Sequence, residues 1–275
     1  DGTINAGLGK RQVTGILLSG TAQQPVLYVS SSDPREGGPS GDLNLDTNSG
    51  VISRLTWNGN GWDKVDLVRG LPRSEENHAP NGMQLDKASN TLYVAIGGNT
   101  NAGSPSQNFA SLTEYAYSGA ILSIDLNAID ALPTQTDFGL STFYKYDLPT
   151  LDDPDRSNSS GNEDINDPWG GNDGLNQAKL VVGGPVQIYA SGFRNAYDFL
   201  ITRLPNKEGR MYTVDNGANG GWGGHPIGEG PAVNGISSAT NQYLTGEPGS
   251  TGPGTGGDAK VNNLDNLHFV TEGFY

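Results

Sequence analysis

A short unit of strands recurs along this chain and limits the folds that it can adopt. In each unit, a strand of alternating apolar and polar residues precedes a second strand with the core Leu-Tyr-Val or Met-Tyr-Thr-Val, and in the first two units a third strand begins at glycine. Alternation with a period of two over short segments predicts half-buried strands. The expected strands are 12–18, 26–30, 50–57 and 62–68 in the first unit; 82–85, 91–96, 119–126 and either 143–148 or 186–190 in the second; and 197–201, 210–214 and 267–270 in the third.

Repeats of four short antiparallel strands are typical of a β-propeller, and the alternative is a β-sandwich with irregular loops. We predict an all-β propeller of four-stranded antiparallel blades with long loops rich in Gly, Asn and Asp, residues 1–275 forming one domain or part of one. They supply about two complete blades and part of a third, whereas closed propellers need ~4–8. We therefore expect the remaining blades to come from the same longer chain or from another chain; the alternative is that the long loops contain further strands.

Charge and composition restrict the partners of this fold. Lys and Arg number 16 against 30 Asp and Glu, a net charge of −14, which argues against nucleic acid and anionic membranes and favours cations. Without cysteine there are no disulfide bonds and no thiolate chemistry. No apolar run approaches the ~20 residues of a membrane span, and the first residues lack the pattern of a signal peptide. The acidic, cysteine-free composition is typical of an extracellular or periplasmic protein.

Long polar insertions separate the expected strands, and loops of this length usually bind something or are held by a bound ion. The insertions are 31–49, 97–118, about 150–184 and about 217–266. Oxygen ligands stand at alternate positions Asp42, Asn44 and Asp46, as at the start of a calcium loop, and a second oxygen-rich cluster includes Asp164 and Asp167. Solvated loops with Asx turns are the alternative interpretation.

The residues best suited to chemistry stand just before the first strands of two successive units. His78 precedes the second unit, and Arg194 with Asn195 precedes the third. In a propeller, equivalent positions converge on one face near the central channel. There a histidine can take a proton at neutral pH, and an Arg-Asn pair can hold carbonyl oxygens. A purely structural loop histidine is the alternative.

Three segments, LPRSEENHAPNGMQLDKASNTLYVAIGGNTNAG, GAILSIDL and YASGFRNAYDFLITRLPNKEGRMYTVDNG, resemble the glucose/sorbosone dehydrogenase family. The resemblance implies a six-bladed propeller that binds pyrroloquinoline quinone and calcium and oxidises the anomeric carbon of sugars. It makes His78 the general base and Arg194, Asn195 and Gln12 contacts of the cofactor.

The resemblance also implies that backbone carbonyls at Gly217 and Ala218 bind the calcium. Two positions depart from the family's pattern: Asn77 stands where an aspartate often precedes the histidine, and Ala218 where proline is usual. The aspartate's orienting role is therefore missing or taken over by Glu76.

Two functions from different classes follow. The first is a secreted quinoprotein aldose dehydrogenase. The second is a non-catalytic, calcium-stabilised extracellular propeller that serves as a binding, adhesion or structural module. Either would take a sugar or polysaccharide as partner. A metal-dependent lactonase is disfavoured, because no convergent set of acidic residues and histidine stands at the strand starts.

Overall fold

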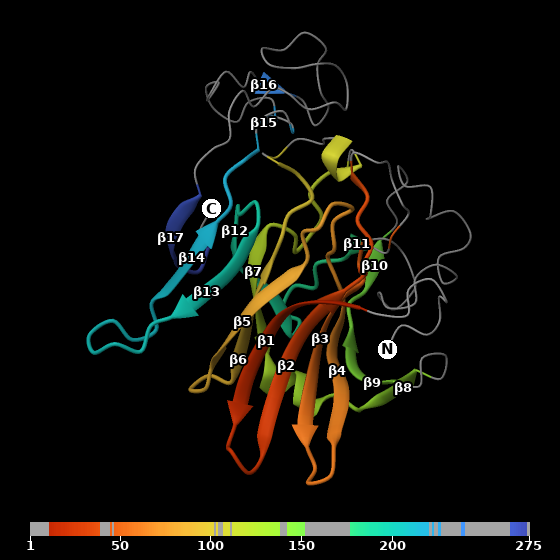
Figure 1. The fold of residues 1–275 in the computed structure, drawn as a ribbon, viewed down its shortest axis with the longest axis vertical. Helices are drawn as coiled ribbons and strands as arrows, with labels where there is room; N and C mark the ends of the chain where they lie inside the picture. The colour runs from red at the N-terminus through yellow and green to blue at the C-terminus, as the bar shows by residue number, and fades with distance from the viewer. Residues whose placement is uncertain are drawn as a thin grey trace.

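The computed structural model describes residues 11–38, 45, 47–101, 103, 107–110, 112–137, 142–151, 177–219, 222, 225–226, 238–239 and 265–273. Strands dominate these residues, with one short α-helix, α1 (Leu126–Ala131), and a 3₁₀ turn, η2 (Gln107–Phe109) (Figure 1). The all-β class predicted from the sequence is confirmed. In the described part of the chain none of the sheets closes on itself.

The first sheet begins as an antiparallel meander and then adds a parallel strand. Its strands are β1 (Gln12–Gly20), β2 (Pro25–Ser32), β3 (Gly50–Trp57), β4 (Trp62–Leu71), β9 (Thr142–Asp147) and β8 (Gln135–Asp137). The strand order is β1-β2-β3-β4-β9-β8, and β9 runs parallel to β4. An ion pair between Arg69 and Asp147 at 3.1 Å, with the Arg69 guanidinium over the ring of Tyr144, joins these two strands.

The middle sheet is a four-stranded antiparallel meander. Its strands are β5 (Pro80–Asp86), β6 (Thr91–Ile96), β7 (Ala120–Asp125) and β12 (Val186–Ser191). The sequence left two segments open as the fourth strand, and the structure selects the later one, since β12 pairs with β7. The earlier segment, 143–148, instead belongs to β9 of the first sheet. The two segments differ in what they bury: Val186 and Ala190 are buried, while β9 carries the half-buried polar side chains of Lys145 and Asp147.

The third sheet has three antiparallel strands in the described residues. They are β13 (Ala196–Ile201), β14 (Met211–Asp215) and β17 (Asn266–Val270), in that order. Two short pairs complete the inventory. They are β10 (Thr150–Leu151) with β11 (Gln177–Ala178), and β15 (His225–Pro226) with β16 (Ser238–Ala239).

The middle sheet is buried on both faces. Alternate residues of its strands enter two different clusters: Leu92 and Val94 of β6 pack with the first sheet, whereas Ala95 packs with the third. The first cluster also holds Tyr28, Ile52, Leu67 and Val68 from the first sheet, and the second holds Phe199, Met211 and Val270 from the third. Strands buried on both sides are expected to be apolar at nearly every position, as β6 (TLYVAI) and β7 (AILSID) are.

The strands that begin the three sheets lie side by side, with β5 between β1 and β13 (Figure 1). Side chains link them: Thr14 of β1 donates to the carbonyl of Pro80, and Gln84 of β5 donates to the carbonyl of Phe199 at 3.1 Å. The first residues of β5 and β13 meet where Asn81 Nδ2 donates to Asn195 Oδ1 at 2.8 Å. The three strands therefore start at the same end of the stack, here called the loop end.

Removing core volume from the middle sheet is expected to destabilise the whole stack. Leu122 of β7 is fully buried in the first cluster, so Leu122→Ala should lower the free energy of unfolding by about 2–5 kcal/mol. Leu204→Ala, at an exposed hairpin position, is the matched control and should change it by less than about 0.5 kcal/mol. Urea unfolding followed by circular dichroism measures both. Equal effects would show that the middle sheet is not the packed centre.

Candidate functional site

Four loop segments meet at the loop end of the sheets. They are residues 72–79 before β5, 97–101 after β6, 192–195 before β13 and 216–219 after β14. Gly98 joins three of them: its N–H donates to the carbonyl of Arg194 at 2.8 Å, and its carbonyl lies 2.8 Å from Nδ1 of His78. The structure thus places His78 and Arg194 on the two sides of one glycine.

His78 is held as a neutral imidazole. Only 2% of its surface is exposed, and the ring packs against Phe109 with centroids 5.0 Å apart. Because the Gly98 carbonyl can only accept, Nδ1 carries the proton of the neutral ring and Nε2 presents its lone pair. Burial lowers the pKa of His78 from 6.5 to about 3, and the positive charge of Arg194 acts in the same direction.

Glu76 faces the nitrogen that a general base uses. Its Oε2 lies 3.8 Å from Nε2 of His78 and accepts a hydrogen bond from the backbone N–H of Asn77 at 2.7 Å. Burial raises the pKa of Glu76. The orienting contact at Nδ1, which the sequence assigned to a missing aspartate or to Glu76, comes instead from the peptide carbonyl of Gly98.

The loop that carries His78 is fixed by a buried arginine. Arg73 donates to the carbonyls of Asp33 at 3.2 Å, Arg35 at 2.6 Å and Glu76 at 2.9 Å, and also to that of Ser74. Burial lowers the pKa of Arg73, although the negative charges of the acidic residues around it act to raise the pKa. Because the guanidinium donates its hydrogen bonds to peptide carbonyls, it links residues 72–79 to residues 33–35 and holds the loop in one conformation.

Asp215 at the end of β14 positions the Arg194-Asn195 pair. Its two carboxylate oxygens accept from the backbone N–H of Arg194 at 2.9 Å and of Asn195 at 2.7 Å. Burial raises the pKa of Asp215, while these two hydrogen bonds stabilise its charged form. The carboxylate therefore links the start of β13 to the end of β14.

The Arg194 side chain lies between aromatic rings. Its guanidinium carbon is 6.0 Å from the Phe109 centroid and 5.8 Å from that of Trp222, and Nε donates to Asn101 Oδ1 at 2.9 Å. Within the described residues its terminal Nη groups make no hydrogen bond. Burial lowers the pKa of Arg194, and Glu76 and Asp215 oppose that shift.

Glycine is required beside this cluster. A Cβ on Gly97 would lie 2.5 Å from the Cβ of His78 and 2.7 Å from Oδ1 of Asn195. Contacts this short are essentially never found for real Cβ atoms, so any side chain at this position would push the His78 and Asn195 loops apart.

A pocket of about 510 Å³ opens next to Arg194. Its lining includes Arg194, Asp215, Gly217 and Ala218. Gly217 and Ala218, which are predicted to bind calcium, therefore line the same pocket as the predicted cofactor contact Arg194. Arg194 is the only Lys or Arg among the described residues that line it. Volume and lining fall in the range of small-molecule sites.

Glu114 organises the opposite wall of the pocket. Its Oε1 accepts from the N–H and hydroxyl of Thr100 at 2.9 and 2.6 Å, and its Oε2 accepts from the Asn99 N–H at 2.9 Å and the Ser118 hydroxyl at 2.5 Å. Asn101 completes the wall by exchanging two hydrogen bonds of 2.9 Å with the backbone of Asn219.

Other residues predicted for the site lie apart from it or beyond the described residues. Gln12 begins β1, and its Oε1 is buried without a hydrogen-bond partner among the described residues. Of the predicted base and cofactor contacts, Arg194 lines the pocket, whereas His78, Asn195 and Gln12 do not. The predicted metal ligands Asp42, Asn44, Asp46, Asp164 and Asp167 lie outside the described residues. Within the described ranges, no group of three or more His, Asp or Glu side chains could hold a metal ion.

Sequence reasoning missed the residues that hold the site together. Asp215 was visible as part of a polar cluster after a strand, but its bonds to the backbone of Arg194 and Asn195 depend on the pairing of β13 with β14. Glu114, Phe109 and Asn101 lie in an insertion without periodicity, so their roles carried no sequence signal.

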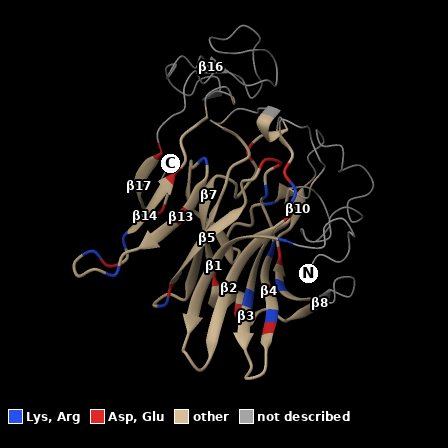
Figure 2. Cartoon of the chain, viewed as in Figure 1, with Lys and Arg blue, Asp and Glu red and all other residues tan. Residues whose placement is uncertain are grey.

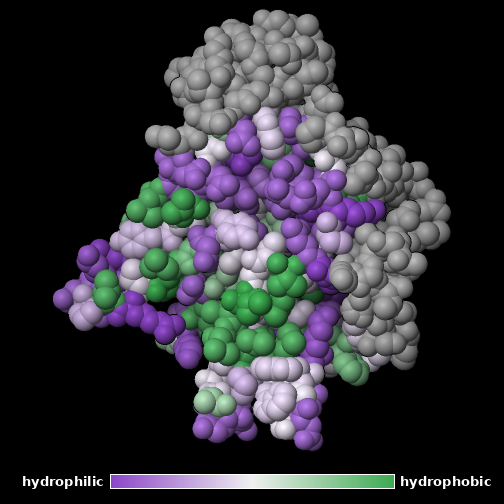
Figure 3. Space-filling view, in the orientation of Figure 1, coloured by the Kyte–Doolittle hydropathy of each residue, from purple (hydrophilic) through white to green (hydrophobic). Residues whose placement is uncertain are grey.

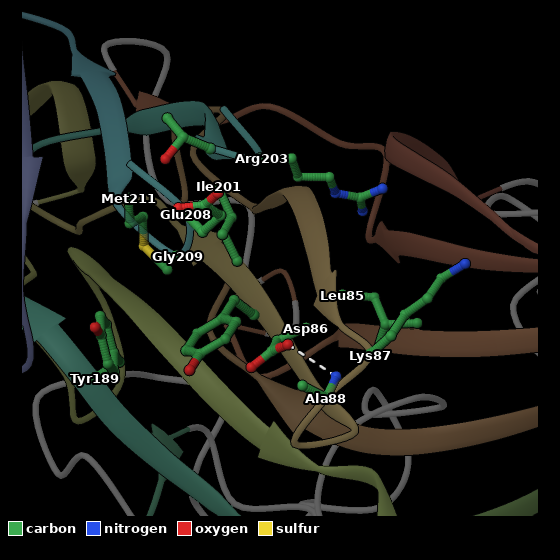
Figure 4. A pocket seen from close by; sticks show the side chains of 12 residues that line it. Leu85, Asp86, Lys87, Ala88, Tyr189, Ile201, Arg203, Glu208, Gly209 and Met211 are labelled. Atoms are coloured by element: carbon green, nitrogen blue, oxygen red, sulfur yellow. Dashed lines mark hydrogen bonds between the residues drawn. The ribbon is translucent and has the colours of Figure 1, made fainter. Parts of the chain in front are cut away.

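A second pocket, of about 300 Å³, lies at the far ends of β5 and β13 and contains none of the predicted residues (Figure 4). Tyr93 and Tyr189 meet there edge to face, with centroids 5.0 Å apart. Asp86 at its rim is committed to the N–H of Ala88 and the hydroxyl of Ser89. The rim also carries Lys87, Arg203 and Glu208, so the charges there are mixed.

No family of known proteins, no curated protein and no solved structure matches this chain. Among the described residues, no helix has the length and apolar character needed to cross a membrane.

The buried neutral imidazole should make stability depend on pH. The unfolded chain binds a proton at His78 below pH 6.5, whereas the folded chain does so only near pH 3. Between pH 6.5 and pH 3, protonation of His78 in the unfolded chain should lower the free energy of unfolding by about 1.4 kcal/mol for each unit that the pH falls. Urea unfolding of the wild type and of His78→Gln across this range measures the effect.

The raised pKa values of Glu76 and Asp215 have the opposite effect: they raise the free energy of unfolding as the pH falls, because the folded state binds these protons more readily than the unfolded state. Both carboxyl groups are present in the wild type and the variant, so the difference between the two curves isolates His78. Parallel curves would mean that the imidazole is not buried in its neutral form.

Proposed function

We propose that this chain is a sugar dehydrogenase of the glucose/sorbosone dehydrogenase type, working with pyrroloquinoline quinone and calcium. The observation that carries the proposal is the meeting of His78, Arg194 and Asn195 around the turn 97–101, beside a pocket lined by Gly217 and Ala218. These are the residues for which the resemblance implied roles in one reaction, and they come from separate loops.

The propeller fold belongs to the same proposal. The middle sheet is an antiparallel meander that begins at its inner strand β5, and the first four strands of the first sheet follow the same plan from β1. With β13, the first strands of the three sheets lie side by side and start at one end. Blades around a common axis would have this arrangement, which supports the proposal. The parallel addition of β9 and β8 to the first sheet extends beyond a simple blade.

The residues of the pocket fit an oxygen-rich, planar ligand. Arg194 offers terminal N–H groups that are uncommitted among the described residues, and a guanidinium pairs well with carbonyl or carboxylate oxygens. Next to the pocket, the amide of Asn99 is fully buried, and among the described residues neither its nitrogen nor its oxygen has a hydrogen-bond partner. Asn99 does not itself line the pocket.

Charge balance explains why a cation would accompany an anionic cofactor. Glu114 and Asp215 line the pocket together with Arg194, so carboxylates outnumber the cation. Backbone carbonyls at Gly217 and Ala218 are the type of oxygen that calcium accepts. When bound, the quinone supplies a hydride acceptor and the calcium a Lewis acid.

The chain's own residues would then have separate tasks. Nε2 of His78, with its lone pair free, would accept the proton of the sugar hydroxyl, while Gly98 fixes the ring through Nδ1. Arg194 would hold a carbonyl oxygen through its Nη groups. Asn195 would contact the cofactor next to Arg194. Asp215 holds it through its backbone N–H, and Asn81 holds it through its side-chain oxygen.

A second candidate function rests on the burial of His78. A histidine with 2% exposure and a pKa near 3 is neutral but shielded from a substrate, as expected of a structural residue. This observation favours the non-catalytic extracellular module that binds a sugar or polysaccharide. In both cases we propose an extracellular or periplasmic location.

The decisive experiment measures quinone binding and turnover separately. Pyrroloquinoline quinone with calcium should bind the protein, as followed by its absorbance, and should support aldose-dependent reduction of an artificial electron acceptor. Arg194→Ala should weaken quinone binding by about tenfold or more, since charge-assisted hydrogen bonds are worth about 1.5–3 kcal/mol. Arg210→Ala, on the distant hairpin, should leave it unchanged.

His78→Ala should abolish turnover while quinone binding persists, because the variant lacks the base and keeps Arg194. Arg210→Ala, at an exposed position of the hairpin between β13 and β14, is again the control. Quinone binding without turnover in the wild type would assign the site to the non-catalytic module. Absence of quinone binding would overturn the proposal.

A further inference from the structure

The pocket at the far ends of β5 and β13 has a wall of two aromatic rings. Tyr93 of β6 and Tyr189 of β12 stand edge to face in it, with ring centroids 5.0 Å apart, and Met211 and Ile201 line it beside them. Both tyrosines are half-buried and pack on the second cluster, which contains Met211. Packing between the middle and third sheets therefore holds the rings, and part of each side chain stays exposed at the pocket.

Residues just after β17 fix the orientation of Tyr189. Its hydroxyl accepts a hydrogen bond from the backbone N–H of Glu272, and its carbonyl accepts one from the N–H of Gly273 at 2.8 Å. Burial raises the pKa of Tyr93 and of Tyr189, and the negative charge of Glu272 acts in the same direction on both. The rings are therefore neutral at ordinary pH and keep the electron-rich faces that attract cations.

Negative charge lies close to these rings. Asp86 lines the pocket, and hydrogen bonds from the Ser89 hydroxyl and the Ala88 N–H lower its pKa, so it remains a carboxylate. Its charge acts on Tyr93. Glu208 adds a further carboxylate from the hairpin between β13 and β14. A positive group beside the rings would therefore meet carboxylates as well as aromatic faces.

The positive charges of the pocket lie on its outer rim. Lys87 and Arg203 are exposed, and in Figure 4 their side chains extend away from Tyr189, whereas Asp86 lies nearer to it. Figure 2 shows charged residues of both signs on the hairpin and on the turn after β5, and in Figure 3 the hairpin is a mostly hydrophilic projection. The pocket thus offers aromatic and negative surface inside and cations at its edge.

These groups select among positively charged ligands. A metal ion needs several oxygen ligands, and the part of the chain that the structure describes holds no group of three or more acidic or histidine side chains suited to one. A primary ammonium needs acceptors for three N–H groups, whereas Tyr93, Ile201 and Met211 offer aromatic and apolar surface. A quaternary ammonium presents its charge through methyl groups, which need no acceptor and pack against such surface.

We propose that this pocket binds the quaternary ammonium group of a choline-type compound, which is either free or the headgroup of a lipid. The methyl groups would lie against Tyr93 and Tyr189, with the neighbouring carboxylates balancing the charge. An anionic group on the rest of the ligand, such as the phosphate of phosphocholine, would face Lys87 and Arg203 at the rim. The pocket lies at the opposite end of the sheets from the candidate site, so this proposal does not depend on the quinone.

Three related ligands test the proposal on the chain without cofactor. They are choline, its uncharged analogue with carbon in place of nitrogen, and ethanolamine, which keeps the charge but lacks the methyl groups. An NMR titration followed at the backbone amides of Lys87, Ala88 and Gly209 should show saturable binding of choline. The other two ligands should each bind at least about threefold more weakly, because one loses the attraction of the rings for a cation and the other loses the methyl contacts.

Substitutions at the aromatic wall test whether the rings provide the binding. Tyr93→Leu keeps apolar bulk and removes the ring, so it should raise the dissociation constant of choline by about threefold or more, whereas Tyr93→Phe should leave it nearly unchanged. Tyr212→Leu is the matched control, because it makes the same change at a tyrosine that does not line the pocket. Circular dichroism checks that each variant is folded.

Cosedimentation with phosphatidylcholine vesicles identifies the source of the ammonium group. Vesicle binding that Tyr93→Leu weakens would assign a lipid headgroup, and choline binding without vesicle binding would assign a free compound. The proposal would be overturned if choline bound no more tightly than either related ligand, or if Tyr93→Leu left binding unchanged. Absence of binding to both choline and vesicles would also overturn it, and none of these outcomes bears on the quinone experiment.

Discussion

The middle sheet carries apolar side chains on both faces, and covering both of them requires a sheet on each side. Alternate residues of β6 and β7 enter two separate clusters, so the first and third sheets are fixed relative to each other only through the middle one. This stacking sets β1, β5 and β13 side by side with their starts at one end. The loops that precede these strands consequently lie at one end, where the hydrogen bonds of Gly98 and Asp215 join them.

The buried polar groups at the loop end need hydrogen-bond partners, and this need determines how the loops are arranged. The peptide unit of Gly98 satisfies both His78 and Arg194, and the carboxylate of Asp215 satisfies the two N–H groups that lead into β13. Arg73 and Glu114 do the same for the neighbouring loops through backbone carbonyls and N–H groups. Unpaired polar groups in such a place cost about 1–3 kcal/mol each, so the network fixes one arrangement of the loops. The same network leaves the Nη groups of Arg194 without a hydrogen bond among the described residues, and it sets Nε2 of His78 3.8 Å from the carboxylate of Glu76.

The sequence by itself determined the all-β class, most strand positions and the pairing of His78 with Arg194-Asn195 as residues at equivalent strand starts. Alternation and turn residues are local, so these features can be predicted from the order of residues alone. Tertiary structure decided the rest. The choice of Val186–Ser191 over 143–148 as the fourth strand of the middle sheet depended on which segment covers β7, and the buried neutral state of His78 depended on Phe109 and Gly98 closing over it. Both outcomes depend on contacts between residues far apart in the chain and on the loss of solvent that these contacts cause. The alternation of apolar and polar residues predicts strands but carries no information about such contacts.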